Sequence, residues 1–416
     1  MEATPYETRI AIAGLDLKMY VSRLDRPWIE SPFLLEGLLV ETQEDLEKLQ
    51  KLCRHVYIDV TRGASPDRRY VEPEEPVAAE KSVPFAAEFA ALNTTTWQIA
   101  TRVEVELPVA AKAQHHLERG IEQMMTDLHD GRELDLLSVR EGVGAMIDSV
   151  TRNPSAFTWL KAIRKKSSYT YQHALGSSVW AASFGRHLGL NRQEIDDLAF
   201  AGLMFDVGKA SLSVELLDKT GSYDDEDWRQ MRAHVQAGVE ILERTPGVSQ
   251  RTIQAVATHH ERHDGSGYPR GLRGAQIPIF GRLIGLIDSY DAMTSARPYA
   301  PGRTAHQAVM ELYNVRDILF QSDLVEQFIQ TCGVYPPGSL VELSDGRVGV
   351  VTAVHDLKRL RPNVMLLLDA IKQPLPEFVA VDLSQVANDD KGKPLTIRRG
   401  LPERAFGIDP AELFIN

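Results

Sequence analysis

The stretch from Val109 to about Gly333 constrains the fold most strongly. Nearly every segment in it repeats apolar residues at spacings of three and four, which is typical of amphipathic helices. Residues that end helices interrupt the pattern at Asn153-Pro154, Gly189, Pro246-Gly247 and the glycine-rich stretch 265–274. The sequence therefore predicts an all-α domain built from successive helices.

Two smaller units flank these helices. Before them, residues 9–59 alternate like short strands around a helix that Thr42 opens with Asp45 three positions later. After Pro336-Pro337, two apolar runs surround a Ser-Asp-Gly turn, and a third strand-like run follows at 361–370. We predict a multidomain chain that is mainly a helical bundle. Its expected parts are a small N-terminal α+β domain (1–72), a Pro-, Ala- and Glu-rich linker (73–107), the helical domain (108–335, core 154–333) and a small β-rich C-terminal unit (336–416).

Composition limits which binding partners and which cellular compartment can be expected. A net charge of -12 argues against a long nucleic acid, because phosphate binding needs a basic face. Cys53 and Cys332, the two cysteines, have no metal-like spacing and favour a reducing compartment. The N-terminus does not resemble a signal peptide, and no apolar stretch approaches the roughly 18 residues of a membrane span. We therefore expect a cytoplasmic protein without a membrane span.

Histidine and aspartate recur along the helical stretch. Five successive segments each carry one toward the apolar side of the predicted helix, and together they supply His173, Asp206, His234, His259 with His260, and Asp288. Imidazoles and carboxylates in such order are typical of a metal centre inside a helical bundle. By contrast, the pair His115-His116 lies on a polar helix and is interpreted as a solvated face.

Asp206 has an unusual place. It follows the uncharged run Leu198 to Phe205, and Lys209 comes three residues later. Burying a lone carboxylate is costly, so we expect a cation or a metal ion beside Asp206.

Three sequence motifs resemble those of a known protein family. "HHERHDGSGYP" (259–269), "IDSYDAMTSARPY" (287–299) and "DVGK" (206–209) are similar to motifs of the HD-GYP family, a branch of the HD superfamily of metal-dependent phosphohydrolases. The similarity covers about residues 154–333. The N-terminal "LDLKMYVSRLDRPWIESPF" (15–33) further resembles a domain of unknown function that often precedes HD-GYP domains in bacteria.

The resemblance implies a phosphodiesterase that hydrolyses cyclic di-GMP, a bacterial second messenger, through a hydroxide bridging two divalent metal ions, commonly iron or manganese. It implies a catalytic Asp206 bridging the metals, one site completed by His234, His259 and His260, and a second completed by His173 and Asp288. Lys209 and Arg297 would bind substrate phosphate. Tyr268 would either stack on a guanine or only brace its loop, and Glu261 and Asp264 would orient ligand histidines.

The sequence departs from the family at Phe205, where the family carries the histidine of its "HD" name. Phenylalanine cannot ligate a metal, so the site of His173 loses a ligand. Tyr169 and Ala300 also replace the Glu and the basic residue frequent at those positions. We expect an enzyme with an impaired metal site. The alternative is a catalytically inactive protein that binds cyclic di-GMP as a receptor, or a protein partner through the GYP loop or the N-terminal domain.

Overall fold

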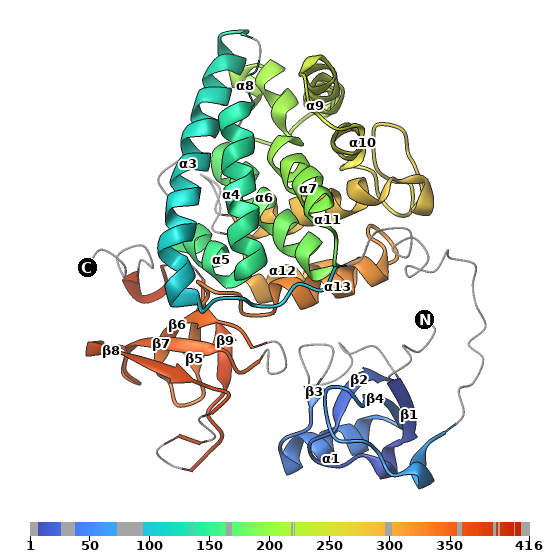
Figure 1. Cartoon of the computed structure of the whole chain (residues 1–416), viewed down its shortest axis with the longest axis vertical. Helices are drawn as coiled ribbons and strands as arrows, with labels where there is room; N and C mark the ends of the chain where they lie inside the picture. The colour runs from blue at the N-terminus through green and yellow to red at the C-terminus, as the bar shows by residue number, and fades with distance from the viewer. Residues whose placement is uncertain are drawn as a thin grey trace.

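The computed structural model describes residues 7–25, 38–72, 95–163, 169–295, 302–355, 360–385 and 388–408, apart from residues 133, 135, 218, 220, 390, 391 and 403. Figure 1 shows a large helical body, a β-sheet at one end of it and a small N-terminal module. The three-part organisation and the mainly helical fold class predicted from the sequence are confirmed.

The N-terminal module is an antiparallel sheet with one helix. Its elements are β1 (Glu7–Ala11), β2 (Tyr20–Leu24), β3 (Leu38–Leu39), α1 (Gln43–Leu52) and β4 (His55–Asp59), with strand order β1-β4-β2-β3. The Thr42 side chain accepts a hydrogen bond from the amide of Asp45 at 3.1 Å, as the sequence predicted for the start of α1. Ile10, Val21, Leu49, Val56 and Ile58 are fully buried, so the module has a core of its own.

Eleven helices in the described part of the chain form the helical body. They are α3 (Val103–His129), α4 (Leu137–Arg152), α5 (Pro154–Ile163), α6 (Tyr169–His187), α7 (Arg192–Met204), α8 (Val214–Leu217), α9 (Asp225–Arg244), α10 (Gln250–Thr258), α11 (Ile279–Thr294), α12 (Ala305–Asn314) and α13 (Ser322–Cys332). Helices end at or several residues before each predicted break, and Gly189 and Gly247 take positive φ angles of 73° and 81° that other residues rarely adopt. No helix in these described segments is long and apolar enough to cross a membrane.

The helical body begins earlier than the predicted boundary at residue 108. Helix α3 starts at Val103 and packs along α4 and α5. Just before it, the indole N–H of Trp97 donates to the carbonyl of Leu190 at 2.9 Å. The described end of the predicted linker is therefore docked on the helices.

The C-terminal unit is a five-stranded antiparallel sheet in the order β8-β7-β6-β5-β9. Its strands are β5 (Leu340–Leu343), β6 (Val348–Ala353), β7 (Asn363–Leu368), β8 (Pro374–Asp382) and β9 (Ile397–Gly400). The sequence predicted the first three strands and missed β8 and β9. Val341 and Val350 belong to the same buried cluster as Phe328 of α13, so this sheet shares the core of the helical body.

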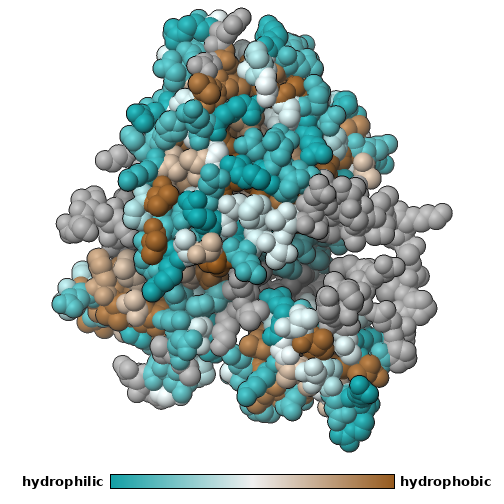
Figure 2. Space-filling view, in the orientation of Figure 1, coloured by the Kyte–Doolittle hydropathy of each residue, from teal (hydrophilic) through white to brown (hydrophobic). Residues whose placement is uncertain are grey.

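The outer surface is mainly hydrophilic on the face shown in Figure 2, with apolar side chains scattered between polar ones. The apolar stripes of the helices point inward instead. In helix α7 every residue from Leu198 to Met204 is buried, and the helix packs against α4, α6, α10 and α11. The chain emerges from this core at Phe205 and Asp206.

Candidate metal centre

Five elements bring the predicted His and Asp residues together. Helix α6 carries His173, the end of α7 leads to Asp206, α9 carries His234, the end of α10 leads to His259 and His260, and α11 carries Asp288. All except the half-buried His260 are at most 9% exposed. Residues up to 115 positions apart thus form one buried polar cluster in the apolar bundle.

The sequence predicted a cation or a metal ion beside Asp206, and the structure places a cation there. The ammonium group of Lys209 lies 2.6 Å from its Oδ2 atom, at the turn η4 (Val207–Ser211). Burial alone would raise the pKa of Asp206, but the positive charges of Lys209 and His173 lower it well below its usual range. Asp206 is therefore an ionised carboxylate inside the bundle.

Gly208 of the same turn allows α9 to come close. A Cβ atom at this position would lie 1.9 Å from the carbonyl oxygen of His234 and 2.4 Å from the amide of Gly238. Only glycine permits this approach. The glycine of "DVGK" thus sets the distance between Asp206 and His234.

Four side chains present their ligand atoms to one point. One ligand atom from each of Asp206, His234, His259 and His260 lies within 4.8 Å of the others. Among the described residues, Asp206 Oδ1, His234 Nε2 and His259 Nε2 are buried and have no hydrogen-bond partner. Buried polar atoms without partners are costly, and a carboxylate with neutral imidazoles is the donor set that divalent metals bind. The residues present therefore fit a metal ion.

The backbone fixes the orientation of two of these imidazoles. His234 Nδ1 donates to the carbonyl of Met231 at 2.6 Å, and His259 Nδ1 donates to that of Val256 at 2.7 Å. Each contact leaves Nε2 as the acceptor that faces the cluster. Burial lowers the pKa of His259 to about 4 and also lowers that of His234, so both rings are neutral near pH 7.

His173 belongs to a second, differently bonded group. Its Nε2 lies 3.0 Å from Asp288 Oδ1 and its Nδ1 lies 2.8 Å from Asp291 Oδ2. Asp291, fully buried, is also paired with Lys161 of α5. Burial lowers the pKa of His173, but its hydrogen bonds with Asp288 and Asp291 outweigh that effect and hold the pKa well above its ordinary value. Sequence reasoning missed Asp291 and Lys161, although the three-residue spacing of Asp288 and Asp291 on one helix face was visible.

Phe205 lies between the two groups. It is fully buried, and its ring meets the ring of His173 edge-on at 5.4 Å and that of His259 at 5.1 Å between centroids. His173 Nε2 is 4.0 Å from Asp206 Oδ2. An apolar ring therefore borders the space in which His173, Asp206 and Asp288 would share a metal ion.

The loop after α10 is braced by the chain itself. The Glu261 carboxylate accepts hydrogen bonds from the amides of Arg270 and Leu272 at 2.8 and 2.9 Å, and Asp264 accepts one from the amide of Ser266. The expectation that Glu261 and Asp264 orient ligand histidines is thus wrong for the described contacts. Acidic side chains in this loop satisfy its backbone amides instead.

Tyr268 lies against the metal-ligand candidates. Its ring stacks on the ring of His260 at 4.6 Å, and the guanidinium carbon of Arg232 lies 5.0 Å from its centre. A Cβ atom at Gly267 would lie 2.4 Å from the carbonyl oxygen of His260, so this glycine permits the close turn. One face of Tyr268 is therefore occupied by His260.

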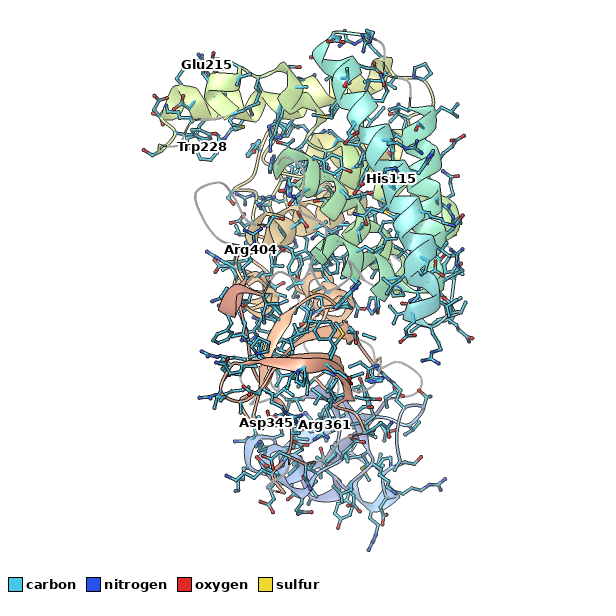
Figure 3. The ribbon with its side chains drawn as sticks, turned by 90° about the vertical axis from the view of Figure 1, so that its left-hand side faces the viewer. His115, Glu215, Trp228, Asp345, Arg361 and Arg404 are labelled. Carbon is cyan, nitrogen blue, oxygen red and sulfur yellow. The ribbon has the colours of Figure 1, made fainter. Side chains whose placement is uncertain are left out.

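Other sequence predictions have simple outcomes. Arg297 and Ala300 lie outside the described residues. His115 is an exposed residue of α3, as expected of a solvated face (Figure 3).

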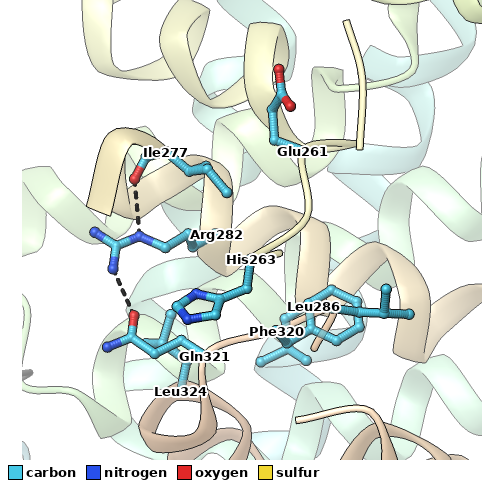
Figure 4. Close-up of a pocket in the computed structure, with 9 residues that line it drawn as sticks. Glu261, His263, Ile277, Arg282, Leu286, Phe320, Gln321 and Leu324 are labelled. Carbon is cyan, nitrogen blue, oxygen red and sulfur yellow. Dashed lines mark hydrogen bonds between the residues drawn. The ribbon is translucent and has the colours of Figure 1, made fainter. Parts of the chain in front are cut away.

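A separate small pocket is lined by His263, Phe320 and Arg282 (Figure 4). The guanidinium of Arg282 donates hydrogen bonds to the carbonyl of Ile277 and to the side chain of Gln321. None of the four converging ligand residues lines this pocket.

The sequence matches three described families in the order of the three structural units. Residues 7–139 match a domain of unknown function, residues 154–320 match the HD domain, and residues 340–388 match a KOW domain associated with the HD domain. The first match extends through α3, so this family unit does not end at the small N-terminal sheet.

Curated relatives share much of the chain. A cyclic di-GMP phosphodiesterase of Pseudomonas aeruginosa is 30% identical over 97% of this chain and 92% of its own length. A 3'3'-cGAMP-specific phosphodiesterase of Vibrio cholerae is 32% identical over 51% of this chain and 42% of its own. A solved HDG"Y"P protein of Bdellovibrio bacteriovorus aligns over 77% of this chain and 98% of its own with a TM-score of 0.44 and 16% identity. Because the Pseudomonas relative matches over nearly its whole length, this chain belongs to the HD-domain family that includes that phosphodiesterase.

Proposed function

We propose that this protein is a metal-dependent phosphodiesterase of the HD-GYP type that hydrolyses cyclic di-GMP. The observation that carries the proposal is the convergence of Asp206, His234, His259 and His260, in which Asp206 Oδ1, His234 Nε2 and His259 Nε2 are buried without a hydrogen-bond partner among the described residues. The full-length similarity to a curated cyclic di-GMP phosphodiesterase supports this choice of substrate.

The chain would hold its metal ion with Asp206, His234, His259 and His260, and iron or manganese suits this nitrogen and oxygen donor set. A divalent ion there would act as a Lewis acid toward a phosphodiester oxygen. Asp206 contributes a fixed negative charge, since Lys209 keeps it ionised. Lys209 is itself 28% exposed and can also attract a substrate phosphate.

A second metal position, at His173 and Asp288, is impaired in this proposal. Phe205 places an apolar ring where the HD-GYP family carries an imidazole ligand, and His173 is held by Asp288 and Asp291. The same observation favours a second candidate function, that of a receptor that binds cyclic di-GMP without cutting it.

One experiment on the purified protein separates these functions. Bound iron and manganese are measured by mass spectrometry, binding of cyclic di-GMP by calorimetry, and its hydrolysis by chromatography. The wild type is compared with Asp206→Ala and with Asp148→Ala, a control that changes an aspartate 56% exposed on α4. We expect metal and turnover in the wild type and the control, and neither in Asp206→Ala. Binding without turnover in the wild type would establish the receptor, and absence of both would refute both functions.

A further inference from the structure

Two exposed side chains of α9 continue outward from the metal cluster. Trp228 and Arg232 are four residues apart and so lie on the same face of the helix. Trp228 is 47% exposed and Arg232 is exposed as well. Figure 3 shows Trp228 at the end of α9 that projects from the helical body. An exposed indole beside an exposed guanidinium is typical of surfaces that bind nucleotides.

Contacts link this pair to the candidate metal centre. His234, a ligand candidate, is two residues beyond Arg232 on the same helix. The guanidinium of Arg232 lies 5.0 Å from the centre of the Tyr268 ring, whose neighbour in turn is the imidazole of His260. Trp228 is six residues from His234, or about 9 Å along the helix axis at ~1.5 Å per residue. Six residues also turn the helix by about 240° beyond one full turn, so Trp228 does not share the face of His234 and is linked to the cluster through Arg232 and Tyr268.

The charges around the cluster indicate what Arg232 can bind. Two other cations lie near the cluster and are engaged within the chain: Lys209 directs its ammonium group to Asp206 at 2.6 Å, and Arg262 donates to the carbonyls of His259 and Glu261. Arg232 forms no ion pair with the described carboxylates, whereas its neighbour Arg229 is paired with Glu226 of the same helix. A guanidinium without a carboxylate partner can fork onto two oxygens of a phosphate.

The indole of Trp228 is held in place by a neighbour. The ring of Tyr223 meets it edge-on at 5.3 Å between centroids. The Tyr223 hydroxyl donates to the carbonyl of Leu216 at 3.1 Å, which anchors that ring to α8. A fixed indole loses little conformational freedom when a base stacks on it.

We propose that Trp228 and Arg232 form a substrate-binding ledge on α9. Arg232 binds a phosphate of the cyclic dinucleotide and Trp228 stacks on one of its guanines. This inference rests on the proposed function, because it assigns further binding residues to the same site. Neither residue touches the reacting phosphorus, so both act on substrate affinity rather than on the chemical step.

The test compares Trp228→Ala, Trp228→Phe and Arg232→Ala with the control Arg229→Ala, which removes an arginine 77% exposed and one turn away. The assays are steady-state hydrolysis of cyclic di-GMP and its binding to chelator-treated protein by calorimetry. Loss of base stacking, or of a phosphate contact, weakens binding by roughly tenfold. We expect Trp228→Ala and Arg232→Ala each to raise KM and Kd about tenfold, with kcat within about twofold of the wild type. Trp228→Phe should recover most of the affinity, and Arg229→Ala should match the wild type.

The possible outcomes distinguish a failure of the proposed ledge from a failure of the proposed function. Unchanged KM and Kd in Trp228→Ala and Arg232→Ala, with an active wild type, would refute the ledge and leave the proposed function intact. A fall in kcat alone would also refute it, because it would indicate a role in the chemical step. A wild type that neither binds nor hydrolyses cyclic di-GMP would refute the proposed function, and the ledge with it. Thermal unfolding and metal content, measured on every variant, identify any change that merely disturbs folding.

Discussion

Replacing Phe205 by histidine tests how one side chain controls the metal centre. The ring of Phe205 is fully buried and meets the rings of His173 and His259 at 5.4 and 5.1 Å. An imidazole in its place would bring a donor atom to the space beside Asp206 and Asp288. We expect Phe205→His to bind one more metal ion per chain than the wild type and to hydrolyse cyclic di-GMP faster.

The same substitution should have opposite effects on stability with and without metal. A buried imidazole nitrogen without a partner costs about 1–3 kcal/mol, and the loss of apolar packing adds to that cost. The free energy of unfolding should therefore fall by roughly 2–4 kcal/mol in chelator. A metal ion at 100 times its dissociation constant would restore about 2.7 kcal/mol.

The assay follows denaturant unfolding of Phe205→His with chelator and with manganese, beside metal content and turnover. Phe205→Leu is the matched control, because leucine disturbs the packing without offering a ligand. Metal should rescue the stability of the histidine variant more than that of the leucine variant. Equal rescue in both, or a wild type that already binds two metal ions and turns over as fast as Phe205→His, would refute the reasoning.

Three further predictions concern the framework of the site. Gly208→Ala should lower the free energy of unfolding by about 1–3 kcal/mol and reduce metal binding, because its Cβ would collide with the backbone of α9. In the control Gly221→Ala the added Cβ meets nothing within 4 Å, so the free energy of unfolding should change by less than about 0.5 kcal/mol. Lys161→Met should cost about 1–3 kcal/mol in urea unfolding, since it removes the ammonium partner of the fully buried Asp291 and leaves that carboxylate with His173. Adding Asp291→Asn should recover part of that loss, and strictly additive effects would contradict the pairing. The pKa of Glu106 lies below its ordinary value of 4.5, because burial, which would raise it, is outweighed by hydrogen bonds from Arg152 and Thr101. The ionised Glu106 therefore stabilises the fold above pH 4.5, and this stabilisation is lost as the pH falls through the lowered pKa. Acid unfolding curves of Glu106→Gln should lack that loss of stability, and an acid dependence equal to that of the wild type would exclude the role of Glu106.

Local chemistry explains what the sequence determined by itself. Apolar spacing and helix-ending residues act over a few positions, so they defined the helices between 109 and 333 and the cap at Thr42. The order of His and Asp along five helices was also visible, and the structure brings His173, Asp206, His234, His259 and Asp288 into one cluster. The sequence further singled out Phe205 beside Asp206.

Tertiary structure decided the contacts between residues far apart in the chain. Lys161 and Asp291 are 130 positions apart, and no local pattern indicates that they pair. Glu261 proved to hold the amides of its own loop, because the path of the folded backbone brings those amides to its carboxylate. Which imidazole nitrogen faces the cluster likewise depends on a backbone carbonyl oriented by the helix, as at His234 and Met231. The sequence thus determined which donor groups are present, whereas only the packing of the helices decided where each donor atom points and which of them remain open to a metal ion.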